Sequence, residues 1–169
     1  DQQHFLGNFR QLRDLNLWKN RLSDFPQVIS DMPYLRVLTL SDNQISLTAE
    51  SAARLRAMSR LHVLKLDGNP LGQVPDISQM PALLILTLNS TGVDTWPIGL
   101  FAKQRPRNLY LDLRFNQISE LPDVAPGSVY AELIARTNVS RDAFHLSAEN
   151  LEKLKQYIES VGLDPDRPY

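Results

Sequence analysis

The chain contains no cysteine among its 169 residues. This absence excludes disulfide bonds, cysteine-ligated metal sites and thiol nucleophiles. Charge of one sign is not in excess either, because 18 basic and 19 acidic residues leave a formal net charge of −1. A nearly neutral chain has no general attraction to nucleic acid or to an anionic membrane surface. No segment approaches the roughly 18 consecutive apolar residues that span a bilayer, so membrane insertion is not expected.

Catalytic and cofactor-binding patterns are missing as well. His4, His62 and His145 are isolated, with no carboxylate or second histidine at the spacing of a metal site or a catalytic triad. No glycine-rich phosphate-binding loop occurs in the sequence. Asp112 and Arg114 are two residues apart on one predicted strand face, which favours an ion pair over acid–base chemistry. We therefore expect no catalytic residue, no cofactor and no metal in this chain.

The chain instead contains a repeated pattern. Leucines lie eight, five and three residues before an asparagine, and an aliphatic residue follows it by two. Spacings of 23, 26, 22 and 25 residues separate the five ladder positions, which are Asn20, Asn43, Asn69, Thr91 and Asn116. The fourth position has threonine in place of asparagine, and the fifth repeat begins with Asn108 in place of leucine. A self-similar period of this length predicts a leucine-rich-repeat solenoid.

Each repeat predicts one short strand. The alternating leucine pairs that mark these strands are Leu15/Leu17, Leu38/Leu40, Leu64/Leu66, Leu86/Leu88 and Leu111/Leu113. Their period of two is that of a strand with one buried side, so stacked repeats form a curved parallel β-sheet on a concave face. The ladder asparagine can pair with backbone groups that the bend after each strand leaves free. A degenerate sixth frame, with Tyr130, Leu133, Ala135 and Asn138, predicts a sixth strand.

The segments between the strands predict a mixed convex side. Apolar–proline pairs such as Phe25-Pro26 and Trp96-Pro97 favour extended or 3₁₀ structure, because proline fixes φ and blocks a regular helix. The second repeat has no proline in its convex segment. Residues 48–58 are therefore expected to form an α-helix with Thr48 as its N-cap.

The C-terminal segment predicts a cap for the open end of the solenoid. Ser147 is a suitable N-cap for a helix over residues 148–161, and Gly162 would end that helix. The expected fold class is thus an α/β solenoid with a mixed 3₁₀, extended and α-helical convex side. Its domain organisation is leucine-rich repeats over residues 1–140, five clear and one degenerate, followed by a capping helix and linker over residues 141–169.

The residues between the buried leucines are expected to point out of the concave sheet. The candidate partner-binding residues are Asn16, Trp18, Thr39, Ser41, Lys65, Asp67, Thr87, Asn89, Tyr110, Asp112 and Arg114. The sixth frame would add Glu132, Ile134 and Arg136. Six strands about 4.8 Å apart make a strip roughly 25 Å across, wide enough for a protein interface. Its mixed charge favours a specific protein partner over a polyanion.

Three aromatic residues are the first candidates for binding anchors. Trp18, Tyr110 and Phe115 qualify because large aromatic side chains dominate the energetics of many protein interfaces. Two structural alternatives stay open: Trp18 packs against a preceding repeat, and Phe115 wedges between adjacent turns. For the charged residues of the face, the alternative is a solvated sheet surface.

The segment after the repeats resembles a known family. Pro126-Gly127-Ser128, Ile134-Ala135-Arg136-Thr137 and Ser160-Val161-Gly162-Leu163-Asp164-Pro165 carry the resemblance, together with the repeats. They are similar to large bacterial effectors that join leucine-rich repeats to a C-terminal novel E3 ubiquitin ligase (NEL, IpaH-like) domain. The resemblance covers nearly the whole chain. The chain departs from the shorter members of that family, whose repeats are tighter, so no binding residue is transferred from them.

The resemblance implies a substrate-recognition module of a secreted bacterial E3 ubiquitin ligase. In several members of that family the repeats also restrain the ligase until a target binds. The implied partners are a host protein substrate and the chain's own downstream ligase domain, and the implied place of action is the host-cell cytoplasm. In that family the ligase domain forms a thioester between a cysteine and ubiquitin. A chain without cysteine is therefore expected to be inert in ubiquitin transfer.

A second hypothesis, from a different functional class, stays open. The chain would then be a freestanding leucine-rich-repeat scaffold or sensor with no attached enzyme. Asp1 lies inside what resembles the tail of a repeat, which leads us to expect a fragment of a longer protein. The sequence downstream of Tyr169 would separate the two hypotheses.

Overall fold

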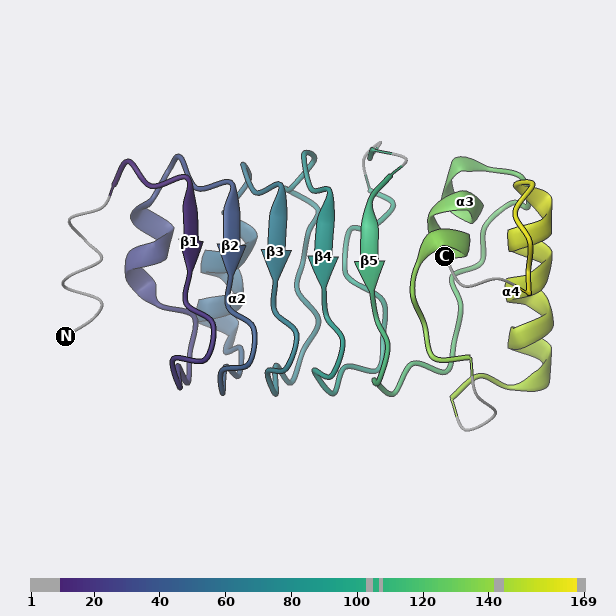
Figure 1. Ribbon diagram of the computed structural model, residues 1–169, viewed down its shortest axis with the longest axis horizontal. Helices are drawn as coiled ribbons and strands as arrows, with labels where there is room; N and C mark the ends of the chain where they lie inside the picture. Colours follow the sequence, from purple (N-terminus) through teal and green to yellow (C-terminus); the bar gives the residue numbers. More distant parts are fainter. Residues whose placement is uncertain (1–9, 103–104, 107, 142–144, 167–169) are drawn as a thin grey trace.

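Five short strands stand side by side in chain order in the computed structural model, which describes residues 10–102, 105–106, 108–141 and 145–166. The strands are β1 (Asp14–Asn16), β2 (Val37–Thr39), β3 (Val63–Lys65), β4 (Ile85–Thr87) and β5 (Tyr110–Asp112). Each pairs in parallel with the next, and the register aligns equivalent positions of the repeats, such as Leu38 with Leu64. The predicted leucine-rich-repeat sheet is therefore confirmed (Figure 1).

The repeated leucines form one core behind the sheet. The central residues of β2 to β5 have no exposed surface, and these residues are Leu38, Leu64, Leu86 and Leu111. Burial of one such side chain contributes about 1.5–3 kcal/mol. Apolar residues of the convex segments close the core from the other side, including Ile29, Met32, Leu55, Met58, Ile77 and Met80. Each repeat thus buries its leucines only by stacking against its neighbours.

The convex elements agree with the sequence-based expectations. A 3₁₀ helix, η1 (Gln27–Asp31), follows the Phe25-Pro26 pair. Helix α2 (Ala49–Arg56) occupies the second repeat, and both elements lie behind the sheet (Figure 1). Thr48 Oγ1 accepts from the Ser51 N–H at 3.0 Å, while Ser51 Oγ accepts from the Thr48 N–H at 2.8 Å. This reciprocal capping explains why the α-helix starts after Thr48.

The asparagine ladder joins each repeat to the one before it. Asn43 Nδ2 donates to the carbonyls of Leu17 and Leu40, at 3.0 and 2.9 Å, and its Oδ1 accepts from the Asn20 N–H at 2.8 Å. The same cross-repeat pattern is found at Asn69 and Asn116. All three side chains are buried. A buried amide is costly unless its donors and acceptor are paired, so these bonds fix the position of each turn.

The ladder is accompanied by a left-handed residue one position earlier. The five residues are Lys19, Asp42, Gly68, Ser90 and Phe115, with φ between 54° and 72°. We call them the turn row, because they occupy equivalent places where the chain leaves each strand. Only Gly68 is a glycine, and a Cβ there would lie 2.1 Å from Asp42 Oδ1. At Asn43, Asn69, Thr91 and Asn116 the turn points the ladder side chain inward and the preceding residue outward.

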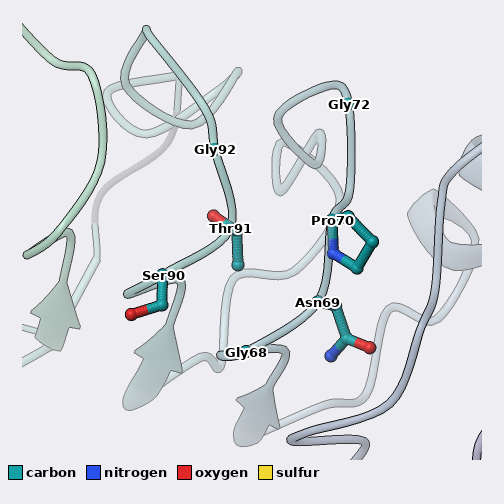
Figure 2. A pocket seen from close by; sticks show the side chains of 7 residues that line it. All are labelled: Gly68, Asn69, Pro70, Gly72, Ser90, Thr91 and Gly92. Carbon is teal, nitrogen blue, oxygen red and sulfur yellow. The ribbon is translucent and has the colours of Figure 1, made fainter.

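Thr91 leaves one rung of the ladder incomplete. Its hydroxyl donates to the Leu88 carbonyl at 2.6 Å, within its own repeat. Among the described residues, no bond of this hydroxyl reaches the third repeat, and the Asn69 N–H has no acceptor. An open hollow of about 510 Å³ lies across this rung (Figure 2), lined by Gly68, Asn69, Pro70, Gly72, Ser90, Thr91 and Gly92. Strands β3 and β4 still pair there, so the fold tolerates the threonine.

The predicted sixth strand is wrong. Residues Val129–Arg136 form helix α3, whose N-cap Ser128 accepts from the Ala131 N–H at 3.1 Å. Ala131, Ile134 and Ala135 are buried at helical spacing. The strand prediction relied on a period of two in the same segment.

This helix changes the concave face at its C-terminal end. Glu132, Ile134 and Arg136 lie in α3 and do not extend the rows of the sheet. Asn138 does not take the ladder position predicted for it, because its isolated parallel bridge is with the strand residue Asp112 and not with Asn116. Its N–H donates to the Leu111 carbonyl at 2.9 Å. The described sheet therefore ends at β5 with a single-residue bridge beyond it.

Two helices close the C-terminal end of the solenoid. Helix α4 (Ala148–Ser160) begins after Ser147, whose hydroxyl accepts from the Asn150 N–H at 3.1 Å, as predicted. It packs with α3 around a second core (Figure 1), which includes Leu121, Ala131, Ile134, Leu154, Tyr157 and Ile158. Tyr157 was not expected in this core, and its hydroxyl donates to the Pro122 carbonyl at 3.0 Å. The cap is thus a helix pair that begins before residue 140.

Replacement of a ladder asparagine by alanine should lower the free energy of unfolding where the side chain is buried, and should change it little where the side chain is exposed. Asn69→Ala removes the acceptor of the Ile45 N–H and a donor to the Leu66 carbonyl, so we expect a loss of about 1–3 kcal/mol in the free energy of unfolding. Asn20→Ala is the matched control, because the exposed Asn20 amide donates only to the Trp18 carbonyl. Its effect should stay within about 0.5 kcal/mol. Equal urea midpoints for the two variants would contradict the role of the ladder.

Completion of the ladder should stabilise the fold. In Thr91→Asn the longer amide can accept from the Asn69 N–H, as Asn43 accepts from Asn20. The adjoining hollow offers room for the larger side chain. We expect a gain of about 0.5–1.5 kcal/mol in the free energy of unfolding, measured by urea denaturation. A lower midpoint than that of the natural chain would show that the rung cannot be completed.

Candidate protein-binding face

The eleven predicted contact residues lie together on the concave face. The first residue of each strand, the third residue and the residue two positions later form three rows across the sheet. The first row is Asp14, Val37, Val63, Ile85 and Tyr110, and the second is Asn16, Thr39, Lys65, Thr87 and Asp112. The third row is Trp18, Ser41, Asp67, Asn89 and Arg114. The parallel register thus converts residues of five repeats into one continuous surface.

Trp18 provides an ordered aromatic ring at the β1 end of this face. Its side chain is 52% exposed. The indole Nε1 donates to Asp42 Oδ2 at 3.0 Å, and Lys19 Nζ lies 4.6 Å from the ring centroid. The Trp18 N–H donates to Asn16 Oδ1 at 3.0 Å. The ring is therefore held by neighbouring polar groups while half of its surface faces solvent, which reduces the entropy lost on binding.

The centre of the face is a polar cross-link between three repeats. Asp67 Oδ1 accepts from Ser41 Oγ at 2.7 Å and from Thr87 Oγ1 at 2.5 Å. Ser41 is buried, and its hydroxyl donates its hydrogen bond to Asp67. Lys65 and Asn89 are half-buried beside this cluster. The cross-link holds β2, β3 and β4 in register on the side that a partner would meet.

Asp112 and Arg114 form the predicted ion pair at the β5 end. Arg114 donates from Nε to Asp112 Oδ1 at 3.0 Å and from Nη2 to Oδ2 at 2.8 Å. These hydrogen bonds raise the pKa of Arg114 above its usual value. Asp112 is only 3% exposed, whereas the Arg114 side chain is 46% exposed. Asp112 therefore positions the guanidinium, and Arg114 is the member of the pair that can contact a partner.

Tyr110 supplies a second aromatic ring near this ion pair. It is 40% exposed at the start of β5. Its hydroxyl accepts from Asn138 Nδ2 at 2.9 Å and lies 3.4 Å from Asp112 Oδ2. The hydroxyl is thus anchored to the end of the sheet, while the ring remains partly open to solvent.

No cluster of potential metal ligands occurs in the part of the chain that the structure describes. No three histidine, aspartate or glutamate side chains there lie close enough to hold a metal ion. His62 Nδ1 lies 2.9 Å from the Arg60 carbonyl, which is a local turn contact. His4 lies outside the described residues. Within that same part, no helix is long and apolar enough to cross a membrane.

The position of the Phe115 ring contradicts the structural alternative, in which the ring would pack between adjacent turns. The ring does not wedge between turns; it is 67% exposed and is the most exposed large apolar side chain in the described chain. The sequence showed only that an aromatic residue precedes the ladder position. The left-handed backbone that turns this residue outward could not be read from its neighbours, because the turn row contains five different residue types.

Arg105 links two convex segments, a role that its position in the repeat did not predict. It stands where earlier repeats have a buried methionine. Its guanidinium donates to the carbonyls of Ile77, Met80, Gly99 and Leu100, at 2.6, 2.8, 2.9 and 2.9 Å. Burial lowers the pKa of Arg105 below its usual value. The side chain replaces an apolar contact with a hydrogen-bonded link between two convex segments.

Comparison with known proteins supports the fold. No family model matches this chain. It is 32% identical over 116 residues, 68% of its length, to leucine-rich repeat-containing G-protein coupled receptor 6 of Homo sapiens. It is 34% identical over 113 residues, 66% of its length, to leucine-rich repeat-containing G-protein coupled receptor 4 of Mus musculus. The chain spans only 12% of the length of each of these relatives.

A solved structure shows the same architecture. A leucine-rich-repeat protein of Leptospira interrogans superposes with a TM-score of 0.62 at 23% identity, over 80% of this chain and 32% of that one. At this identity the likeness concerns the fold alone. The repeats, the parallel sheet and these similarities show that the chain is a leucine-rich-repeat domain, a scaffold fold for binding other proteins.

Proposed function

We propose that the chain binds a protein partner on its concave face, with Trp18 and Tyr110 as anchors. The main support is that two partly exposed rings are held by hydrogen bonds at opposite ends of one continuous face. Four strand spacings of about 4.8 Å separate them by roughly 19 Å across the sheet, and they also lie in different rows along the strands. A partner that covers both rings would also cover the polar cross-link at Asp67. Aromatic anchors around hydrogen-bonded polar groups are typical of protein interfaces.

The finer part of the proposal concerns the identity of the partner. The chain acts as the substrate-recognition module of a bacterial E3 ubiquitin ligase that is secreted and works in the host-cell cytoplasm. Its partner is then a host protein, and its own downstream NEL domain is a second partner during autoinhibition. The support is the sequence resemblance of Ile134-Ala135-Arg136-Thr137 and of the segment from Ser160 to Pro165.

A second candidate function is recognition by a freestanding repeat scaffold or a receptor. Identities of 32% and 34% to leucine-rich repeat-containing receptors favour this candidate. Both candidates use the same concave face, and they differ in what is attached to it.

The ligase assignment predicts a cysteine-dependent activity in the full-length protein. Sequence beyond Tyr169 should encode a helical domain with a cysteine, and that protein should form a reductant-sensitive adduct with ubiquitin when supplied with activating and conjugating enzymes. Replacement of that cysteine by alanine should abolish the adduct, and the 169-residue chain alone should form none. A stop codon directly after Tyr169, or full-length protein that forms no adduct, would favour the freestanding scaffold.

The concave-face assignment predicts a loss of binding when an anchor is removed. Proteins captured on the immobilised chain from a host-cell lysate are identified and purified, and their Kd is measured by calorimetry. Trp18→Ala and Tyr110→Ala should each weaken binding at least about tenfold, because anchors typically contribute 2 kcal/mol or more.

Tyr34→Ala is the matched control for these variants. Tyr34 is 42% exposed, and Arg60 lies 5.9 Å from its ring centroid, but it stands outside the three rows. Its replacement should leave the Kd unchanged. Full binding by both anchor variants, with unaltered melting temperatures, would refute the concave-face assignment.

A further inference from the structure

A row of basic residues precedes the first three strands of the sheet. Arg13, Arg36 and His62 each come directly before a strand, at the edge where all five strands begin (Figure 1). The Arg36 N–H donates to the Arg13 carbonyl at 2.8 Å, and the His62 N–H donates to the Arg36 carbonyl at 2.8 Å. Neighbouring strands lie about 4.8 Å apart, so the three side chains start from adjacent points of one line. We call these three residues the basic row.

The two arginines of the basic row form no ion pair with any residue that the structure describes. Both are exposed. Arg54, Arg114 and Arg136, in contrast, each pair with an aspartate or a glutamate. Like charges at facing positions of neighbouring strands destabilise a sheet. The juxtaposition of Arg13 and Arg36 therefore does not stabilise the fold, and both guanidinium groups are open to a ligand.

The charge around the basic row is positive on balance. Arg10 and Arg60 lie close to it in the chain and are exposed. The exposed acidic residues nearest to it in the chain are Asp14 and Asp31. Four arginines against these two aspartates leave a net charge of +2, whereas the whole chain carries −1. The beginning edge of the sheet is thus a basic region on a chain that is otherwise acidic on balance, which favours an anionic ligand there.

The row directly after the basic row is apolar over the middle strands. Val37, Val63 and Ile85 occupy the first positions of β2, β3 and β4 and are half-buried. A ligand that contacts the Arg36 guanidinium group is therefore next to aliphatic surface. The backbone of a nucleic acid or of a sulfated polysaccharide offers only anions and polar groups to such a surface, whereas a protein segment offers carboxylates together with apolar side chains. The combination favours an acidic protein segment over a polyanion.

We infer that the basic row binds an acidic segment of the partner protein, with carboxylates on Arg13 and Arg36 and neighbouring apolar side chains on Val37 and Val63. The guanidinium group suits this role, because its planar N–H groups can bind a carboxylate through two parallel hydrogen bonds. Exposed charges at the rim of an interface mainly raise the association rate and select among partners. This inference rests on the proposed function and specifies the chemistry of the partner at the beginning edge of the sheet.

The test uses a defined probe. A phage-displayed library of random linear peptides of about twelve residues is panned on the immobilised natural chain; at about 3.3 Å per residue such peptides can cross the whole face. Enriched peptides should combine several aspartates or glutamates with aliphatic residues. Synthetic copies should bind the double variant Arg13→Gln/Arg36→Gln at least about fivefold more weakly, chiefly through slower association. Copies with glutamine in place of each acidic residue should bind the natural chain and this variant alike.

Arg56→Gln/Lys155→Gln is the matched control, because it removes the same charge far from the basic row. Arg56 is an exposed residue at the end of α2 behind the sheet, and Lys155 is an exposed residue of α4. At physiological ionic strength this control should bind the acidic peptides within about twofold of the natural chain. The melting temperature of Arg13→Gln/Arg36→Gln should stay unchanged or rise, since two like charges are removed from neighbouring strands. A fall of several degrees would show that the arginines stabilise the fold and would overturn the inference.

The other outcomes separate this inference from the proposed function. Peptides that bind Arg13→Gln/Arg36→Gln as tightly as the natural chain, yet lose affinity for Trp18→Ala or Tyr110→Ala, overturn the inference and leave the concave-face proposal standing. Peptides that depend on the two arginines but bind both aromatic variants fully support the inference and contradict the anchors of the proposed function. Enrichment of peptides without acidic residues, or of none, overturns the inference.

Heparin, an anionic polysaccharide, tests the other class of ligand. It should bind the natural chain more weakly than the acidic peptides at physiological ionic strength, because it cannot use the aliphatic row. Tighter binding of heparin than of every enriched peptide, lost in Arg13→Gln/Arg36→Gln, would make the basic row a polyanion site and overturn the inference.

Discussion

The fold depends on one constraint, which is that a buried amide must have all of its polar atoms paired. Asn43, Asn69 and Asn116 meet it only when each turn sits against the turn of the preceding repeat. That requirement holds neighbouring turns together at these three rungs, and the strands keep the same register at the Thr91 rung as well. A left-handed residue precedes each rung, whether the rung is a buried asparagine, the exposed Asn20 or Thr91. The leucine core supplies most of the stabilisation, and the ladder supplies the geometry.

The same geometry creates the concave face that we propose as the binding surface. Side chains of five repeats stand in rows because their backbones are held in register. Hydrogen bonds within the face, from Ser41 and Thr87 to Asp67 and from Arg114 to Asp112, keep polar groups fixed. A partner on this face would therefore contact an ordered surface on which the aromatic rings expose apolar area. Recognition by such a scaffold depends on the residues that it displays, and the fold permits many choices there.

Much of the repeat architecture could be predicted because its period is unambiguous. The leucine spacing gave the strands, Thr48 gave the start of α2, and Ser147 gave the start of α4. The segment around Leu133 was misread, since eight residues with both alternating and helical apolar spacing fit either structure, and the Ser128 cap decides for the helix. The rows of the concave face were predictable from alternation. The exposure of Phe115 was not, because the left-handed φ recurs through the turn row whatever the residue type.

The two tryptophans of the chain allow the central claim to be tested in one measurement. Trp18 lies on the concave face, whereas Trp96 packs between the two cores and donates its indole N–H to the Glu120 carbonyl at 3.0 Å. Their indole N–H resonances can be followed by two-dimensional ¹⁵N–¹H NMR during titration with the purified partner. The account predicts that the Trp18 resonance shifts or broadens while that of Trp96 stays in place. A shift of Trp96 with an unchanged Trp18 would place the interface elsewhere and contradict the account.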